Sequence, residues 1–213
     1  LTDLDPDKEY KFQYSFGATS FDDRRTFDPY TEILYDAYND QWIKDDVYPG
    51  LGSYSTTGFI SAFQIKCPEY NWKVADYQIE DENDLVIYEL LLRDFTDNAY
   101  GEGNIKAAME YLDYLENLGV NAIELMPVQE FEGNDSWGYG THAYFALDKV
   151  YGTREAYKEF IDACHQRGMA VFFDVVYNHA TGAHPYAALY WDDGAGNVTD
   201  ANPWFFVEPT HPY

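Results

Sequence analysis

The chain has 213 residues, 46% of them hydrophobic, which is enough to bury a core. Its 38 acidic and 13 basic residues give a formal net charge of −25, which disfavours binding to nucleic acid or to an anionic membrane. The sequence contains no run of about 18 apolar residues and its start lacks a basic and an apolar region, so we expect no transmembrane helix and no signal peptide.

Residues 1–80 have the pattern of strands and loops. Polar and apolar residues alternate over 8–16, which predicts a half-buried strand, and 57–65 is a second strand candidate. The stretch between them is rich in turn residues. Two or three strands are too few for a stable sandwich. We therefore interpret 1–80 as the tail of a β-domain.

The pattern changes at residue 81, after which strand and helix signals alternate. The dense apolar run 85–91 predicts a strand buried on both faces. Apolar residues at helical spacing predict a helix over 105–118, with Gly119 just past its end. The segment 120–126 is the next predicted strand, and Pro127 ends it.

A second helix and a third strand follow. Thr153 is expected to cap the helix at its N-terminus, Cys164 to face the core, and Gly168 to close it. Residues 170–174 form the third strand. This alternation predicts an α/β fold with a parallel sheet, either open and doubly wound or closed as a (β/α) barrel. No Gly-rich phosphate loop follows the first strand, which disfavours nucleotide binding.

In such folds the working residues follow the carboxyl ends of the strands. Arg93 and Asp94 follow the first strand, and a structural salt bridge is the favoured interpretation. Trp137 and Tyr139 follow the second strand among glycines. They are candidates for an aromatic wall against a ligand ring, and a packed loop is an equally good interpretation.

Asp174, Asn178 and His179 follow the third strand. An aspartate at a strand end can serve as an acid, a base, a metal ligand or an anchor, and a histidine there can bond a hydroxyl or exchange a proton. No second His or Cys lies nearby at metal-ligand spacing, so a zinc site is not expected.

Several motifs then occur in order, and together they carry a resemblance. They are Asp84–Glu89, Leu118–Val128, Trp137–Tyr139, Tyr151–Thr153 and Asp174–His179. Over about residues 84–180 the chain resembles the α-amylase family of glycoside hydrolases, in the branch near branching enzymes and pullulanases. The resemblance implies that 81–213 is the N-terminal part of a (β/α)8 TIM barrel: its first three βα units and the loop after strand three. It also implies that 1–80 is the C-terminal part of an accessory β-sandwich domain that precedes the barrel.

The resemblance also implies roles for the candidate residues. His179 would hydrogen-bond a glucose, Tyr139 would stack on the same sugar, and Trp137 would add to the substrate-binding wall. Asp174 would be a supporting carboxylate and not the nucleophile. Asn178 is a possible ligand of a structural Ca²⁺, and no other cofactor is expected.

The implied reaction is retaining cleavage of α-1,4 or α-1,6 bonds in starch- or glycogen-type glucans, which needs two carboxyl groups about 5–5.5 Å apart. The family carries them after strands four and five. The carboxylates after Asp174 follow no apolar strand: Asp192, Asp193, Asp200 and Glu208. We therefore expect the catalytic pair to lie outside these residues and the chain alone to be inactive.

Two other functions stay open: a branching transglycosylase acting on α-glucan, and a non-catalytic glucan-binding fragment. The expected partner is an α-glucan oligo- or polysaccharide. The sequence leaves the oligomeric state open. It favours an extracellular or cell-envelope location slightly over a cytoplasmic one.

Overall fold

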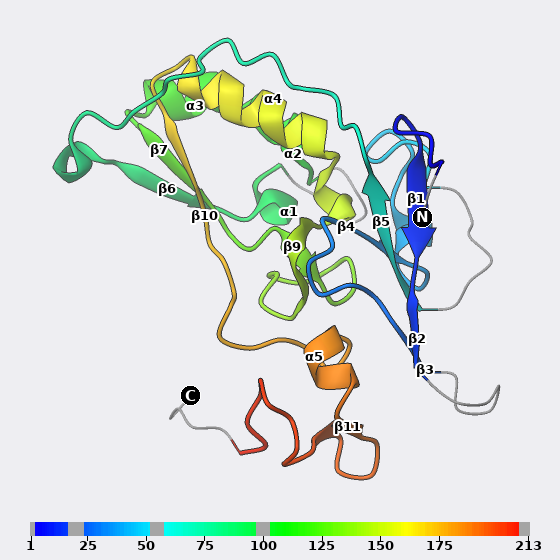
Figure 1. The fold of residues 1–213 in the computed structure, drawn as a ribbon. Helices are drawn as coiled ribbons and strands as arrows, with labels where there is room; N and C mark the ends of the chain where they lie inside the picture. The colour runs from blue at the N-terminus through cyan, green and yellow to red at the C-terminus, as the bar shows by residue number, and fades with distance from the viewer. Residues whose placement is uncertain (1–2, 17–23, 52–57, 97–102, 209–213) are drawn as a thin grey trace.

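A computed structural model describes residues 3–16, 24–51, 58–96 and 103–208 (Figure 1). The first strands form a layer at one side of the molecule, and a parallel sheet covered by helices lies at the other. Among the described residues no helix is long and apolar enough to cross a membrane.

The N-terminal layer is antiparallel. Its main sheet has the order β1-β5-β4, and a separate ribbon pairs β2 with β3. The bounds are β1 (Glu9–Phe12), β2 (Tyr14–Phe16), β3 (Arg24–Thr26), β4 (Ile33–Asp36) and β5 (Phe59–Gln64), with a 3-10 turn η1 (Asp40–Trp42) after β4. The β-rich prediction for this region is confirmed in kind, whereas its membership of an accessory β-domain and the boundary at residue 80 stay predictions.

The single strand predicted over 8–16 is two strands that part at Gln13. Here β1 pairs with β5, while β2 leaves that sheet to pair with β3. The Gln13 side chain donates from Nε2 to the carbonyl oxygen of Phe59 at 2.8 Å. It therefore stays attached to the sheet that β2 leaves. Alternation of polar and apolar residues cannot reveal such a change of partner.

The C-terminal sheet is parallel, with the order β10-β7-β6, as the α/β prediction requires. Its strands are β6 (Ile87–Leu90), β7 (Ala122–Leu125) and β10 (Ala170–Phe173). The prediction that the first strand is buried on both faces is wrong, because the Ile87 side chain is 51% exposed. The strand buries Leu90 against the helices, while Glu89 on its other face is exposed.

Helices pack over one face of this sheet and contribute to its core: α1 (Leu92–Phe95), α2 (Ile105–Met109), α3 (Leu112–Asn117), η3 (Lys149–Tyr151) and α4 (Arg154–His165). Two further elements lie outside this layer: η2 (Glu82–Asp84) before β6, and α5 (Pro185–Ala188) in the segment after β10 (Figure 1). The helix predicted over 105–118 is broken: Glu110 and Tyr111 donate to carbonyls three residues back, which marks a tightened turn between α2 and α3. The apolar stripe continues across the break, since both Ile105 and Leu115 are fully buried.

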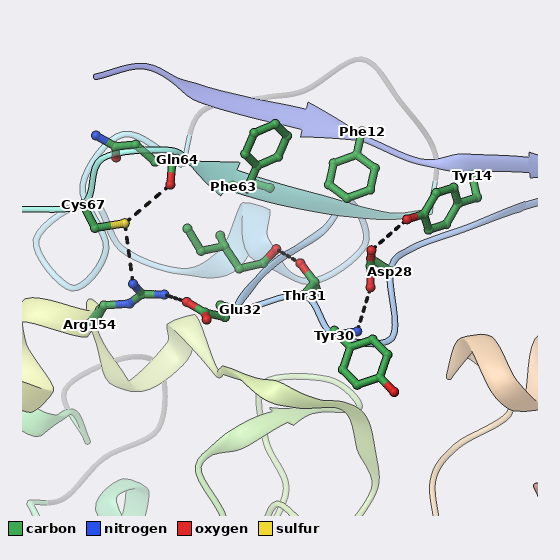
Figure 2. Close-up of a pocket in the computed structure, with 12 residues that line it drawn as sticks. Phe12, Tyr14, Asp28, Tyr30, Thr31, Glu32, Phe63, Gln64, Cys67 and Arg154 are labelled. Atoms are coloured by element: carbon green, nitrogen blue, oxygen red, sulfur yellow. Dashed lines mark hydrogen bonds and ion pairs between the residues drawn. The ribbon is translucent and has the colours of Figure 1, made fainter. Parts of the chain in front are cut away.

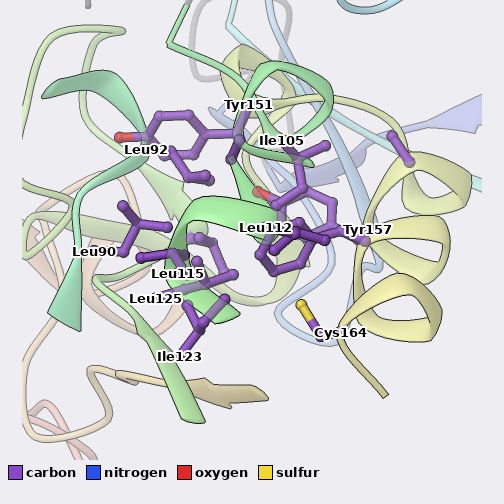
Figure 3. Packing of buried hydrophobic residues seen from close by; sticks show 14 of the residues in the cluster. Leu90, Leu92, Ile105, Leu112, Leu115, Ile123, Leu125, Tyr151, Tyr157 and Cys164 are labelled. Atoms are coloured by element: carbon purple, nitrogen blue, oxygen red, sulfur yellow. The ribbon is translucent and has the colours of Figure 1, made fainter. Parts of the chain in front are cut away.

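The helices and the sheet enclose one apolar cluster, drawn in Figure 3. Ile123 from β7 and Leu115 from α3 belong to it, as do Phe160 and Cys164 from α4, and all are fully buried. The prediction that Cys164 is a core residue is confirmed. Burial also raises the pKa of its thiol to about 12, which keeps the thiol protonated and unreactive.

The fourth helix begins and is held where the sequence indicates. The Thr153 side chain accepts a hydrogen bond from the backbone N–H of Ala156, so the predicted cap is confirmed. On the same helix the Asp162 carboxylate accepts from the backbone N–H of Lys73 at 3.0 Å and of Val74 at 3.1 Å. These bonds hold the long connection from β5 to β6 against the helix (Figure 1).

A buried charged cluster joins the N-terminal strands to the segment between β7 and β10. The Lys149 ammonium lies 2.7 and 2.8 Å from the two Glu130 carboxylate oxygens and 3.3 Å from Asp40. It also donates to the carbonyl oxygen of Leu34 in β4. We call Lys149, Glu130 and Asp40 the junction triad, and all three are buried.

Two further antiparallel strand pairs lie outside these two sheets. They are β8 (Gln129–Phe131) with β9 (Thr141–Leu147), and β11 (Trp191–Asp192) with β12 (Asn197–Val198). The first pair carries the loop with Trp137 and Tyr139, and the second lies in the long segment after β10.

Candidate functional site

The site forms where β7 and β10 end side by side. Asp174 is the first residue after β10, and its backbone N–H still donates to Leu125 at the end of β7. Two residues later the backbone N–H of Val176 donates to the side-chain Oε1 of Gln129 at 2.7 Å. These bonds fix the backbone on both sides of Asp174, so its carboxylate has a defined position at the strand ends.

Three of the predicted site residues come together there. The Tyr139 hydroxyl donates to Oδ2 of Asp174 at 2.8 Å, and Nε2 of His179 lies 2.8 Å from the carbonyl oxygen of Tyr139. A carbonyl oxygen only accepts, so Nε2 carries the proton in this arrangement. In this tautomer Nδ1 is an acceptor. We call Tyr139, Asp174 and His179 the strand-end cluster.

The cluster sets the protonation state of its tyrosine. The hydrogen bond to Asp174, together with partial burial and nearby carboxylates, raises the pKa of Tyr139 to about 12. The hydroxyl therefore stays protonated at neutral pH and acts as a donor.

The glycine before Tyr139 permits this placement. Gly138 has a φ of +91°, and a Cβ there would lie 2.4 Å from the carbonyl oxygen of Pro127. Only glycine can make this close approach to the end of β7 without a clash. The loop thus folds back on the strand and brings Tyr139 to Asp174.

Trp137 does not join the cluster. Trp137 is 62% exposed, whereas Tyr139 is 38% exposed and is held by its bond to Asp174. An aromatic wall formed by the two residues stays a prediction. A substrate-binding role for Trp137 stays a prediction.

Two acidic residues of the site were missed from the sequence. Glu89 in β6 and Glu124 in β7 are register partners, and both add to the raised pKa of Tyr139 through their negative charge. The signal was present, since each is the one charged residue in an otherwise uncharged strand. With Asp174 they make the carboxyl edge of this sheet strongly acidic.

A cavity of about 500 Å³ opens beside His179, between the end of β10 and the long segment that follows. Trp204 and Phe206 line it from that segment, and Asn178 lines it from the strand end. Its size lies within the range of small-ligand pockets, and aromatic walls with a few polar groups suit a sugar ring.

The described residues do not make a metal centre. None of the His, Cys, Asp and Glu side chains within 3–16, 24–51, 58–96 and 103–208 form a group of three that could hold an ion. Asn178 is exposed and supplies one oxygen, whereas Ca²⁺ takes six to eight. These residues by themselves do not fit a Ca²⁺ site, and the possible ligand role of Asn178 stays a prediction.

Arg93 and Asp94 form the expected structural pair. Nε of Arg93 lies 2.7 Å from the Asp94 carboxylate, and Nη1 lies 2.6 Å from Asp135 in the loop after β8. The guanidinium thus ties the end of β6 to the loop that carries Trp137 and Tyr139.

A buried histidine anchors the segment after β10. His184 is fully buried, and its ring lies 4.5 Å from the ring of Tyr144 in β9, measured between centroids. The Tyr144 hydroxyl donates to the carbonyl oxygen of His179 at 3.2 Å. Burial lowers the pKa of His184 to about 4, so the ring is neutral at neutral pH.

Residues 69–211 match the model of the alpha-amylase catalytic domain. The chain belongs to the α-amylase family. The strand-end cluster lies inside the matched region, and the parallel sheet is consistent with part of the TIM barrel of such a domain.

Curated relatives agree with this family. The chain is 44% identical over 132 residues to malto-oligosyltrehalose trehalohydrolase of Arthrobacter ramosus, covering 61% of this chain and 22% of that protein. It is 33% identical over 133 residues to oligo-1,6-glucosidase of Heyndrickxia coagulans, covering 56% of this chain and 24% of that protein. The chain thus spans about a quarter of the length of these relatives.

Solved structures share the fold. The Group B Streptococcus pullulanase SAP in complex with maltotetraose superposes with a TM-score of 0.60 at 27% identity, over 84% of this chain and 26% of that one. The catalytic module of the glycogen-degrading pneumococcal virulence factor SpuA superposes with a TM-score of 0.59 at 27% identity, over 82% of this chain and 28% of that one.

Proposed function

We propose that the chain is part of a glycoside hydrolase that acts on α-glucans with retention of configuration, and that it supplies part of the substrate-binding side of the site. The strand-end cluster is the observation that carries this proposal. It puts a phenol, a carboxylate and an imidazole at the edge of a parallel sheet where α/β barrels hold their substrates. The family match and the maltotetraose-bound pullulanase support the choice of substrate.

Each member of the cluster has a role in the proposal. Nδ1 of His179 accepts a hydrogen bond from a glucose hydroxyl, because Nε2 is held by Tyr139. The Tyr139 ring packs on the same sugar, and Asp174 holds that ring in place through the hydroxyl. The Asp174 carboxylate is a positioning group rather than a nucleophile, because it follows the third strand whereas the family carries its catalytic pair after strands four and five.

Retaining hydrolysis needs a nucleophile and an acid/base at about 5–5.5 Å. We assign neither role to Asp174. Glu89 and Glu124 lie side by side in neighbouring strands, one residue before each strand ends. We assign them to the acidic surface beneath the bound sugar, which we call the charged floor of the site. The proposal therefore places the catalytic pair in the part of the enzyme that this chain does not cover.

The test uses the full-length protein and maltoheptaose, with reducing ends and product anomers followed over time. We expect cleavage with retention, and Tyr139→Phe should lower kcat/KM about tenfold because the hydrogen bond that holds the ring to the Asp174 carboxylate is lost. Tyr114→Phe, on the outer surface of α3, is the matched control and should leave kcat/KM unchanged. A full-length protein inactive on maltoheptaose, glycogen and pullulan would refute the proposal.

Glu89→Gln and Glu124→Gln test the assignment of the floor. Loss of a catalytic carboxylate removes almost all turnover, whereas loss of a floor charge should cost only about tenfold. A loss of many thousandfold in either variant would overturn the assignment and place the catalytic pair on these strands.

Branching transfer is the second candidate, because the cluster can bind a donor glucan for either reaction. Product analysis separates the two: a branching enzyme makes new α-1,6 links without releasing reducing ends. A non-catalytic glucan-binding role predicts retention on amylopectin with no change in the glucan.

A further inference from the structure

A second pocket lies in the N-terminal layer, away from the strand-end cluster. Figure 2 shows it between the strands β1 and β5, the segment 28–32 and the first residue of α4. Its volume is about 530 Å³, which is within the range of small-ligand sites. None of its lining residues belongs to the strand-end cluster or to the cavity beside His179.

Aromatic rings form one wall of this pocket. The ring of Phe12 packs edge-on against Phe63 at 5.7 Å and against Tyr14 at 5.6 Å, measured between centroids. Tyr14 remains 42% exposed although it lines the pocket. Ring–ring contacts hold the wall rigid, so a ligand that packs on it orders few side chains.

Polar groups form the opposite rim. The Asp28 carboxylate accepts from the Tyr14 hydroxyl and from the backbone N–H of Tyr30, both at 2.8 Å. Glu32 accepts from Nη2 of Arg154 at 2.6 Å, and its side chain is 68% exposed. Each carboxylate offers about four lone-pair sites, so both retain acceptors for a ligand after these bonds are made.

These two sides select a class of ligand. An aromatic wall suits the apolar C–H face of a sugar ring, while carboxylate acceptors suit its hydroxyl groups. The two rim carboxylates and the net charge of −25 repel anionic ligands such as nucleotides. A purely apolar partner would take water from the carboxylates and the Arg154 guanidinium without offering them new hydrogen bonds.

We propose that this pocket is a second α-glucan-binding site, which holds a neighbouring stretch of the same polysaccharide while the strand-end cluster binds another. The choice of α-glucan rests on the proposed function; the sugar class itself rests on the pocket. Arg154 belongs to the helix that packs on the parallel sheet, so the site is fixed relative to the strand-end cluster. Two sites on one rigid chain favour long glucans over short ones by raising the effective concentration.

The test uses the full-length protein in native gels that contain amylopectin. Tyr14→Ala should weaken retardation, with an apparent dissociation constant about five- to tenfold higher, because a ring–sugar contact is lost. Its kcat/KM on maltotriose should equal that of the wild type, because a trisaccharide is too short to occupy both sites. Tyr14→Phe keeps the ring and should bind amylopectin within about twofold of the wild type.

Tyr114→Ala on α3 is the matched control for loss of an exposed tyrosine, and a thermal melt of each variant shows that it is folded. Equal retardation of folded Tyr14→Ala and wild type would overturn the proposal. A structure of the full-length protein in which other residues of the protein fill this pocket and bury Tyr14 would also overturn it.

The two proposals fail separately. Loss of retardation without any glucan hydrolysis upholds this site alone, and hydrolysis with unchanged retardation upholds the proposed function alone.

Discussion

Two buried regions of the molecule are held by different forces. The cluster under the parallel sheet consists of hydrophobic side chains, Leu115 and Phe160 among them. The junction of the N-terminal strands with β8 and η3 instead buries Lys149 between Glu130 and Asp40, beside a smaller apolar cluster that contains Leu34. Burial alone would lower the pKa of Lys149, but the two carboxylates outweigh it and hold that pKa above its usual value.

The difference teaches what each region can tolerate. Apolar contacts are short-ranged and non-directional, so a lost methyl group costs roughly in proportion to the volume removed. A buried ion pair depends on all its partners, because removing one leaves the others charged and desolvated. A single substitution in the junction triad should therefore lower stability more than a single substitution in the apolar cluster. The triad should also fix how the N-terminal strands are joined to the rest of the chain.

The largest expected effect is at the junction. Lys149→Met should lower the free energy of unfolding by about 3–5 kcal/mol, because Glu130 and Asp40 are left buried without a counter-charge. Urea unfolding of the full-length protein measures it. Glu130→Gln in the Lys149→Met background should restore part of the loss, and an additive double variant would show that the two groups do not interact.

A smaller loss is expected under the sheet. Leu115→Ala should cost about 3 kcal/mol, since the side chain is fully buried and leaves a cavity. The same urea experiment measures it, and Tyr111→Ala at the exposed turn between α2 and α3 is the control. If Leu115→Ala cost more than Lys149→Met, the proposed ranking of the two regions would be wrong.

A buried group outside both regions, His184 in the segment after β10, should make stability depend on pH. His184, with a pKa near 4 when folded and an ordinary value of 6.5, binds fewer protons when folded. Its contribution to stability is thus complete above pH 6.5 and is lost as the pH falls toward 4. Lowering the pH from 7.5 to 5.5 should cost about 1.4 kcal/mol through this group.

Comparison with His184→Gln isolates that effect from other groups. Burial raises the pKa of Asp148 to about 6, which makes its own contribution fall as the pH rises, in the opposite sense. We therefore subtract the unfolding free energy of His184→Gln from that of wild type at each pH. This difference should decrease as the pH falls from 7.5 to 5.5. Parallel profiles would show that His184 is not the titrating group.

The smallest expected effect is at the start of α4. Thr153→Ala removes the bond to the backbone N–H of Ala156 and should cost about 1 kcal/mol. Thr153→Ser keeps a capping oxygen and should cost a few tenths of that. A shift in the urea midpoint measures both, and an equal loss in the two variants would show that the methyl group rather than the cap matters.

Local patterns were enough to identify the elements that form the apolar cluster. The stripe from Ile105 to Leu115 and the cap at Thr153 appear in the structure at the predicted positions, because both depend only on residues close in sequence. The strand ends at Leu125 and Phe173 were likewise predictable, and with them the position of Asp174.

Other features depended on residues far apart. The pairing of Glu89 with Glu124, the bond from Tyr139 to Asp174 and the ion pair of Lys149 with Asp40 each join segments separated by many residues. The sequence indicated that these residues are polar, not which of them meet. The burial of β6 was predicted wrongly for the same reason, because its second face depends on what packs against it.

The sequence by itself determined the order of the strands and helices that form the parallel sheet and its core, and the place where site residues follow the strands. Periodicity, caps and turn residues act over a few positions, so these features are written locally. Only the tertiary structure decided that the Tyr139 hydroxyl meets Asp174, and that an aromatic pocket opens beside Tyr14. Those outcomes follow from close approaches between distant segments, such as Gly138 against Pro127, which no local pattern specifies.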